Sequence, residues 1–180
     1  MPSKPFSKIR AILTDVDGCL TDGRLYLGID EGSEYAAFDV HDGVAHRLAQ
    51  VAGLPVVWLT GRVSKSVEAR AKRLGVVKLF QGRVDKVQTA QAWCKGRGLD
   101  LSEVVFIGDD LIDVALMERV GWSVAPSNAR PEAKKAADYV TKTHGGRGVF
   151  REVVETILRR QGRWAKVRAT YEKGASKGMF

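Results

Sequence analysis

The sequence predicts an α/β fold in which a parallel sheet carries helices on both faces. Two patterns predict it: short apolar runs alternate with segments of helical spacing, and the connections between them are brief. The length and composition agree with one domain. The chain has 180 residues, 44% of them hydrophobic, which suffices for a single buried core but is too few for two ordinary domains.

The first part of the chain predicts a strand, a hairpin and a helix. Ala11–Thr14 is a short apolar run, as expected of a buried strand. Arg24–Leu27 and Tyr35–Phe38 flank a stretch rich in glycine and acidic residues, which predicts a projecting β-hairpin over residues 24–40. The apolar spacing of Gly43–Val51 predicts the first helix.

From residue 55 onward, strands and helices alternate regularly. Apolar runs predict strands at 55–59, 76–80, 104–107, 122–125 and 139–140. Helical spacing predicts helices at 64–74, 85–95, 111–120, 131–137 and 149–160. Gly75 and Gly121 are stop signals for two of these helices, and Pro131 is a start signal for a third.

The composition argues against several classes of protein. The longest apolar run, Leu54–Leu59, has six residues, whereas a membrane span needs about 20, so we expect no membrane partner. Met1–Arg10 is polar and basic, so we expect no secretory signal. Cys19 and Cys94 show no paired spacing, which argues against a disulfide scaffold or a zinc knuckle and favours a reducing, cytoplasmic location.

The formal net charge of +8 is concentrated near the C-terminal end. Residues 159–180 hold seven Lys or Arg and one Glu, which leaves 22 basic and 20 acidic residues in 1–158. We therefore divide the chain into a domain at 1–158 and a basic tail at 159–180. Because apolar periodicity fades in this tail, we expect it to be solvated and mobile.

Four short polar elements each follow a predicted strand. They are Asp15–Gly18, Thr60–Arg62, Lys86, and Gly108–Asp113 with its three aspartates. In a parallel sheet, the carboxyl ends of the strands meet at one edge, where ligands bind. We therefore expect these elements to converge into one site.

The residue types in this set point to phosphoryl transfer. Clustered carboxylates raise one another's pKa unless a cation neutralises them, and Mg²⁺ combines carboxylates with waters and substrate phosphate. The Thr60 hydroxyl and the Lys86 ammonium are suited to phosphate oxygens. Each residue alone is an ordinary turn, cap or surface residue, but the four elements together predict a reaction through an aspartyl-phosphate.

The order of these elements resembles the haloacid dehalogenase superfamily of phosphatases, over about residues 8–158. The resemblance implies a haloacid dehalogenase-like Rossmannoid sheet. It also implies that Asp15 is the nucleophile and Asp17 the general acid and base. Thr60 and Lys86 would bind the transferring phosphoryl group.

By the same resemblance, Mg²⁺ would be held by Asp15, the backbone carbonyl of Asp17, and Asp109. Asp110 and Asp113 would support the metal site, and which of them matters more is left open. The segments between the motifs are too short for the cap domain that many members carry. A large substrate or another subunit would then have to close the site.

A closer resemblance is to the 3-deoxy-D-manno-octulosonate 8-phosphate phosphatase family. It rests on the segments at 15–23, 38–43, 59–62 and 145–148. It implies a phosphoric monoester hydrolase that removes phosphate from an eight-carbon sugar acid in lipopolysaccharide inner-core biosynthesis. It also implies a capless homotetramer whose hairpins pair between subunits, and we expect the apolar residues Leu25, Leu27 and Phe38 to face outward for this purpose.

The residues expected to bind substrate are Thr60, Gly61, Arg62, Lys86, His41 and Arg147. Two positions depart from the family pattern: His41 stands where Arg or Lys is more usual, and Cys19 where Val is. A phosphatase of a nine-carbon sugar acid phosphate therefore stays open as an alternative. From another class, a nucleic-acid-binding protein that uses the basic tail is a second alternative, although we expect no nucleic-acid partner.

Overall fold

Six parallel strands form the central sheet of the computed structural model, which describes residues 6–30 and 33–177. Their order across the sheet is β5-β4-β1-β6-β7-β8. The bounds are β1 Ala11–Thr14, β4 Val56–Leu59, β5 Lys78–Phe80, β6 Val104–Ile107, β7 Trp122–Ala125 and β8 Tyr139–Val140. The predicted parallel sheet is confirmed, and β1, β6, β7 and β8 have the predicted bounds.

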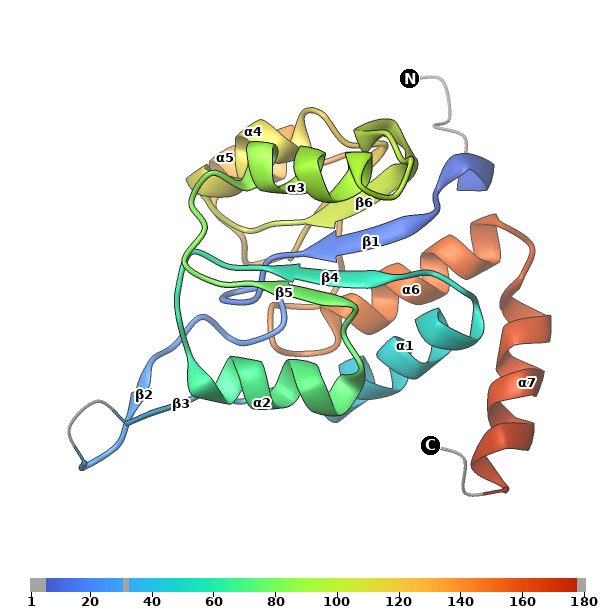
Figure 1. Cartoon of the computed structure of the whole chain (residues 1–180), viewed down its shortest axis with the longest axis horizontal. Coiled ribbons are helices and arrows are strands. Elements are labelled where there is room, and N and C mark those ends of the chain that lie inside the picture. The colour runs from blue at the N-terminus through green and yellow to red at the C-terminus, as the bar shows by residue number, and fades with distance from the viewer. Residues whose placement is uncertain (1–5, 31–32, 178–180) are drawn as a thin grey trace.

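Helices cover both faces of this sheet (Figure 1). One face carries α1 Val40–Val51, α2 Lys65–Leu74, α6 Val149–Arg160 and α7 Trp164–Ala175. The other carries α3 Lys86–Lys95, α4 Leu111–Met117 and α5 Pro131–Ala136. Two short 3₁₀ helices, η1 Phe6–Lys8 and η2 Leu101–Glu103, precede β1 and β6. Within the described residues, no helix combines the length and apolar character needed to cross a bilayer.

The central strand β1 is buried on both faces. Ile12 packs into the apolar cluster on the α1 side, and Leu13 into the cluster on the α3 side. Such two-sided burial requires a continuous apolar run, which is what the sequence has at this position. Thr14 pairs with Trp58 of β4 and with Ile107 of β6, so the residues that follow these three strands lie at one edge of the sheet.

The hairpin projects from this edge, as Figure 1 shows. Its strands, β2 Tyr26–Leu27 and β3 Glu34–Tyr35, pair antiparallel and are shorter than predicted. One expectation about it was wrong: Phe38 does not face outward. Its ring is half-buried and stacks on Trp58 with 5.8 Å between ring centroids, because the chain has already turned back to the body before α1 begins.

The basic tail is not a mobile segment over its whole length. Residues 164–175 form α7, which packs against α1 and α6. Val167 is buried, and the partly buried Trp164 and Tyr171 pack against the core. The expectation of a solvated tail was therefore wrong for these residues, although the division of the chain after residue 158 stays a prediction. The spacing of the three apolar residues is helical, and that signal was missed.

Candidate active site

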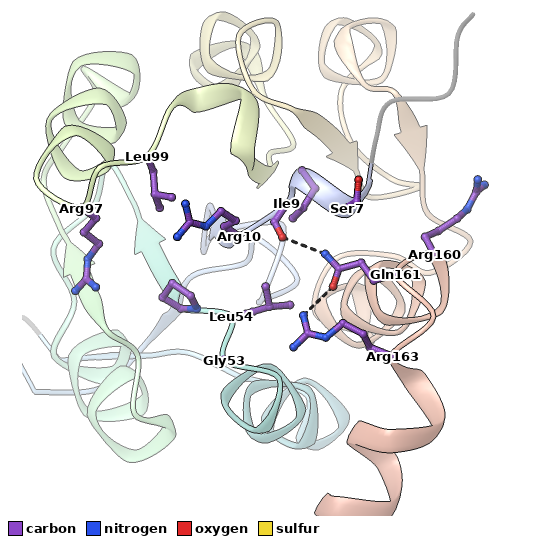
Figure 2. A pocket seen from close by; sticks show the side chains of 11 residues that line it. Ser7, Ile9, Arg10, Gly53, Leu54, Arg97, Leu99, Arg160, Gln161 and Arg163 are labelled. Atoms are coloured by element: carbon purple, nitrogen blue, oxygen red, sulfur yellow. Dashed lines mark hydrogen bonds between the residues drawn. The ribbon is translucent and has the colours of Figure 1, made fainter.

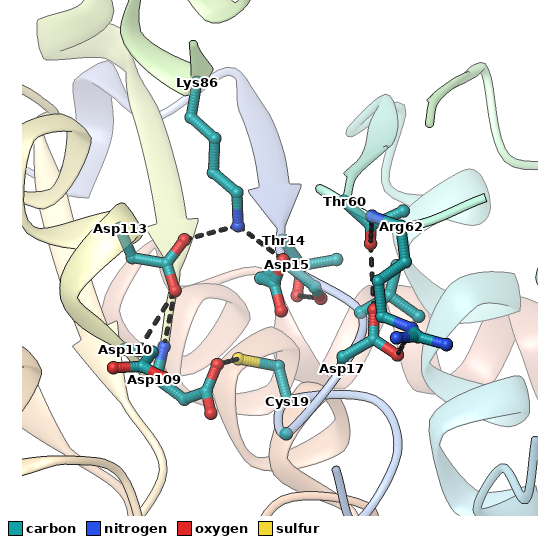
Figure 3. Close-up of polar contacts among 12 residues, drawn as sticks. Thr14, Asp15, Asp17, Cys19, Thr60, Arg62, Lys86, Asp109, Asp110 and Asp113 are labelled. Carbon is teal, nitrogen blue, oxygen red and sulfur yellow. Dashed lines mark hydrogen bonds and ion pairs between the residues drawn. The ribbon is translucent and has the colours of Figure 1, made fainter. Parts of the chain in front are cut away.

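An ion-paired triad of Asp15, Lys86 and Asp113 lies at the carboxyl edge of the sheet (Figure 3). Asp15 follows β1, Lys86 begins α3, and Asp113 lies in the first turn of α4. The Lys86 Nζ atom is 2.5 Å from Asp15 Oδ1 and 2.6 Å from Asp113 Oδ1. Burial alone would lower the pKa of Lys86, but the two carboxylates outweigh it and raise that pKa. Lys86 is therefore a fixed, charged ammonium.

Asp113 also organises the loop that precedes α4. Its Oδ2 atom accepts hydrogen bonds from the backbone N–H groups of Asp109, at 2.9 Å, and Asp110, at 3.2 Å. The exposed Asp110 side chain instead accepts from the N–H of Leu111 as the cap of the helix. Of the two aspartates left open by the sequence, Asp113 is thus the one that joins the loop to Lys86.

Asp17 and Thr60 meet beyond the carboxyl ends of the paired strands β1 and β4. The Thr60 hydroxyl donates to Asp17 Oδ2 at 2.8 Å and accepts from the backbone N–H of Arg62 at 3.0 Å. The Arg62 Nε atom is 3.7 Å from Asp17 Oδ1. The carboxyl group of Asp17 is therefore held beside a hydroxyl and a guanidinium, while part of it stays accessible to solvent.

Arg62 has a second partner, Glu34 of the hairpin strand β3. The Arg62 Nη2 atom lies 2.6 Å from Glu34 Oε2, and the Ser66 hydroxyl donates to the Glu34 backbone carbonyl at 2.8 Å. These two contacts join the loop end of β3 to Arg62 and to the first turn of α2. The sequence analysis missed Glu34, because an acidic residue in a glycine-rich hairpin loop is typical of any solvated turn.

A group of residues that could hold a metal ion lies beside the triad. Asp15, Cys19 and Asp109 each place one ligand atom so that these atoms all lie within 4.8 Å of one another. Burial is the main cause that raises the pKa of Asp109 to about 7, and it also raises that of Asp15 well above the usual range. Buried, mutually repelling carboxylates of this kind fit a divalent cation, which would neutralise them.

The same group shows which atoms suit Mg²⁺. The Cys19 thiol lies 3.9 Å from Asp109 Oδ1, and burial raises the pKa of this thiol, so it stays protonated and is a poor ligand for a hard cation. The carboxylates of Asp15 and Asp109 are the suitable donors. Gly18 makes room for them, because a Cβ atom there would lie 2.1 Å from Asp109 Oδ2.

His41 and Arg147, predicted to bind substrate, line one pocket together. The pocket has a volume of about 360 Å³, and Tyr26 and Asp39 also line it. The His41 ring is 2.9 Å from Asp39 Oδ1 through its Nδ1 atom. Two residues more than 100 positions apart in the sequence thus border the same cavity, at the foot of the hairpin.

Gly61 lies between Thr60 and Arg62, at a position where a larger side chain would also fit. A Cβ atom there would be 3.6 Å from the nearest Val84 methyl group, which is an ordinary contact. Gly145 differs, because its Cβ atom would lie 1.8 Å from the carbonyl oxygen of Gly18. The glycine-rich loop before α6 is therefore pressed against the backbone of the loop that carries Asp15 and Asp17.

Comparison with known proteins shows which sequences this chain is similar to. A family model for haloacid dehalogenase-like hydrolases matches residues 49–153. The chain is 43% identical over 155 residues to a 3-deoxy-D-manno-octulosonate 8-phosphate phosphatase of Salmonella typhi, and the match covers 86% of this chain and 82% of that protein. The corresponding protein of Yersinia pestis is 41% identical over 152 residues, which cover 84% of this chain and 81% of that one.

Solved structures show the same likeness. A phosphatase of that name from Moraxella catarrhalis, in complex with a magnesium ion, a phosphate ion and a KDO molecule, superposes with a TM-score of 0.89. It is 35% identical, and the match covers 93% of this chain and 95% of that one. The cobalt-bound enzyme from Haemophilus influenzae gives a TM-score of 0.84 at 34% identity, covering 89% and 93% of the two chains.

Proposed function

Because the chain belongs to the 3-deoxy-D-manno-octulosonate 8-phosphate phosphatase family of haloacid dehalogenase-like hydrolases, we propose that it hydrolyses that sugar acid phosphate to the free sugar acid and inorganic phosphate. It is a Mg²⁺-dependent phosphoric monoester hydrolase of lipopolysaccharide inner-core biosynthesis. The observation that carries the proposal is the buried triad of Asp15, Lys86 and Asp113 beside Asp109, on a chain of this family. None of the observations favours the nine-carbon substrate or nucleic acid.

The chemistry begins with Asp15. Its carboxylate attacks phosphorus in line with the leaving sugar oxygen, so the P–O bond to the sugar breaks as the aspartyl-phosphate forms. Asp17 donates a proton to that oxygen and later takes one from the water that hydrolyses the aspartyl-phosphate. Asp17 suits both steps, because it is partly exposed to solvent and its Oδ2 atom is already held by the Thr60 hydroxyl.

The neighbouring cations and donors stabilise charge on the phosphoryl group. Lys86 supplies a permanent positive charge, and Asp113 fixes its position by an ion pair at 2.6 Å. The Thr60 hydroxyl contacts a phosphate oxygen when it turns from Asp17. Asp15, Asp109 and the backbone carbonyl of Asp17 would hold Mg²⁺, and Asp110 and Asp113 support the loop that carries Asp109. When bound, Mg²⁺ acts as a Lewis acid on the phosphoryl oxygens.

The sugar acid end of the substrate binds toward the pocket that His41 and Arg147 line. Arg147 offers a guanidinium to the carboxylate, and His41 adds a second positive charge when protonated. Gly61 and Arg62 contact the substrate beside Thr60. Arg62 is already engaged by Glu34 and Asp17, so it is oriented before substrate binds.

The test is phosphate release from a panel of sugar phosphates by the intact protein and by Asp15→Asn. We expect the eight-carbon sugar acid phosphate to be preferred over its nine-carbon counterpart and over glucose 6-phosphate, and Mg²⁺ to be required. Asp15→Asn should abolish turnover while the circular dichroism spectrum is unchanged, because an amide cannot form the acyl phosphate. Substantial turnover by this variant would refute the assignment of the nucleophile.

We propose a homotetramer assembled through the hairpins. Leu25, Leu27, Ile29 and Tyr35 of the hairpin are all exposed, and two strands of two residues each are not stable alone. Light scattering should show four chains, and Leu27→Glu should reduce that number and the activity together. A fully active monomer would contradict the proposal.

We also propose a cytoplasmic location. Cys19 and Cys94 are both free and buried, which supports a reducing compartment.

A further inference from the structure

A second cavity lies at the opposite edge of the sheet from the acidic cluster, where β1 and β4 begin (Figure 2). Its volume is about 710 Å³, within the range of small-molecule sites. Four arginines line it: Arg10, Arg97, Arg160 and Arg163. They come from three separate parts of the chain, before β1, after α3 and at the end of α6, so the fold gathers this positive charge and no single basic run accounts for it.

The positive charge of this cavity is poorly compensated. Among the described residues that line it, none is acidic. Arg10 forms one long ion pair, in which its Nη1 atom lies 3.6 Å from Glu103 Oε1. Arg97 has no carboxylate partner within the described part of the chain, and its guanidinium instead lies 5.1 Å from the centre of the Trp93 ring. A bound anion would relieve the repulsion among these groups.

Part of the cavity wall is already fixed. The Gln161 side chain donates to the carbonyl oxygens of Phe6 at 2.9 Å and Ile9 at 3.0 Å, and it accepts from Arg163 Nη1 at 2.9 Å. Arg163 also donates to the carbonyl oxygen of Ala52. Its guanidinium is thus held at the rim before a ligand binds, which lowers the entropy lost on binding.

The remaining lining gives the cavity a mixed character. Leu54, Pro55 and Leu99 form an apolar part of the wall beside the arginines. In Figure 2 the Arg160 side chain points away from the other three arginines, so the cluster that faces a ligand is Arg10, Arg97 and Arg163. Guanidinium groups bind phosphate through paired hydrogen bonds and also stack on flat aromatic rings.

We propose that this cavity is a second binding site, for a small molecule that combines a diphosphate with a flat, weakly polar ring, as a nucleoside diphosphate does. Three guanidinium groups match the charge of about −3 that a nucleoside diphosphate carries at pH 8. The apolar wall accepts the ring. The site is separate from the catalytic one and does not depend on the proposed function.

Calorimetric titration with ADP, pyrophosphate and adenosine tests the proposal. EDTA is added, because the acidic cluster repels phosphates when no divalent cation is present. We expect a saturable isotherm for ADP, with pyrophosphate and adenosine each at least about tenfold weaker. The double variant Arg10→Gln/Arg97→Gln should bind ADP at least about tenfold more weakly than the wild type. The control for net charge is Arg119→Gln/Lys135→Gln, which also removes two positive charges, from exposed residues outside the cavity.

Three results would overturn the proposal. The first is no saturable binding of ADP at millimolar concentration. The second is an equal loss of affinity in Arg119→Gln/Lys135→Gln and in Arg10→Gln/Arg97→Gln, which would mean unspecific attraction to a basic protein. The third is pyrophosphate binding as tightly as ADP, because the apolar wall would then contribute nothing. Phosphatase activity of Arg10→Gln/Arg97→Gln, expected to be unchanged, verifies that it folds.

Discussion

Replacing Lys86 by methionine should cost more stability than any surface substitution, and the cost should depend on pH. The ammonium lies between Asp15 and Asp113, and all three side chains are at most 6% exposed. Methionine fills a similar volume but leaves two buried carboxylates without a counter-ion. Removing one partner of a buried ion pair destabilises a protein by about 3–5 kcal/mol. We expect a loss of this size for Lys86→Met at pH 8 without metal.

The pH dependence follows from proton binding. Without Lys86, the pKa of Asp15, already raised by burial, rises further above its value in the unfolded chain. The folded variant then binds more protons than the unfolded one above about pH 4, so its stability falls as the pH rises through that window. The loss relative to wild type should therefore be smaller, by about 1–3 kcal/mol, at pH 5.5 than at pH 8.

Urea unfolding followed by tryptophan fluorescence in EDTA measures both quantities. Lys95→Met is the matched control, because Lys95 is an exposed residue of the same helix, and it should change the free energy of unfolding by less than about 0.5 kcal/mol. In the double variant Lys86→Met/Asp113→Asn, the loss should be smaller than the sum of the two single losses. Equal losses for Lys86→Met at both pH values would refute the reasoning.

Three further predictions concern other parts of the molecule. Gly18→Ala should weaken Mg²⁺ binding about 10–100-fold in a calorimetric titration, because its Cβ atom would displace Asp109; unchanged affinity would mean that Asp109 moves aside freely. Trp164→Ala should lower the free energy of unfolding by about 1–3 kcal/mol without changing kcat, and a negligible loss would contradict the packing of α7. Burial raises the pKa of Asp42 to about 7, so wild-type stability should fall between about pH 4 and pH 7. Asp15 and Asp109 contribute to the same fall, so Asp42→Asn should make it smaller, and parallel pH profiles of the two proteins would argue against this role of Asp42.

The strands and the position of the site were predictable because both depend on local signals. A continuous apolar run such as Val104–Ile107 has few alternatives to a buried strand, and the acidic residues after it are placed by the strand itself. The contact between Lys86 and Asp113 was not predictable, since it depends on how α3 and α4 are rotated on the sheet. Likewise, the ion pair of Glu34 with Arg62 depends on the direction of the hairpin, which the body of the protein determines.

The tail shows a different limit of the sequence. Basic residues dominate the composition of the tail, so the helical spacing of the three apolar residues that pack α7 against the core is easily missed in the sequence. The guanidinium of Arg159 lies over the Trp164 ring, 4.6 Å from its centre. Arg159, which was expected to be a solvated charge of the tail, therefore contributes to the packing of α7. Spacing is thus a better guide than net charge in such segments.

The contact of the loop before α6 with the loop after β1 has a consequence for synthesis of the protein on the ribosome. Asp15 and Cys19 emerge early, but Asp109, which lies against Cys19, follows 90 residues later. Gly145, whose backbone covers Gly18, comes later still. The nascent chain therefore cannot enclose a cation or a phosphate until nearly all of it has been made. A truncated product of stalled translation would carry Asp15, the proposed nucleophile, without the residues that surround it in the complete fold.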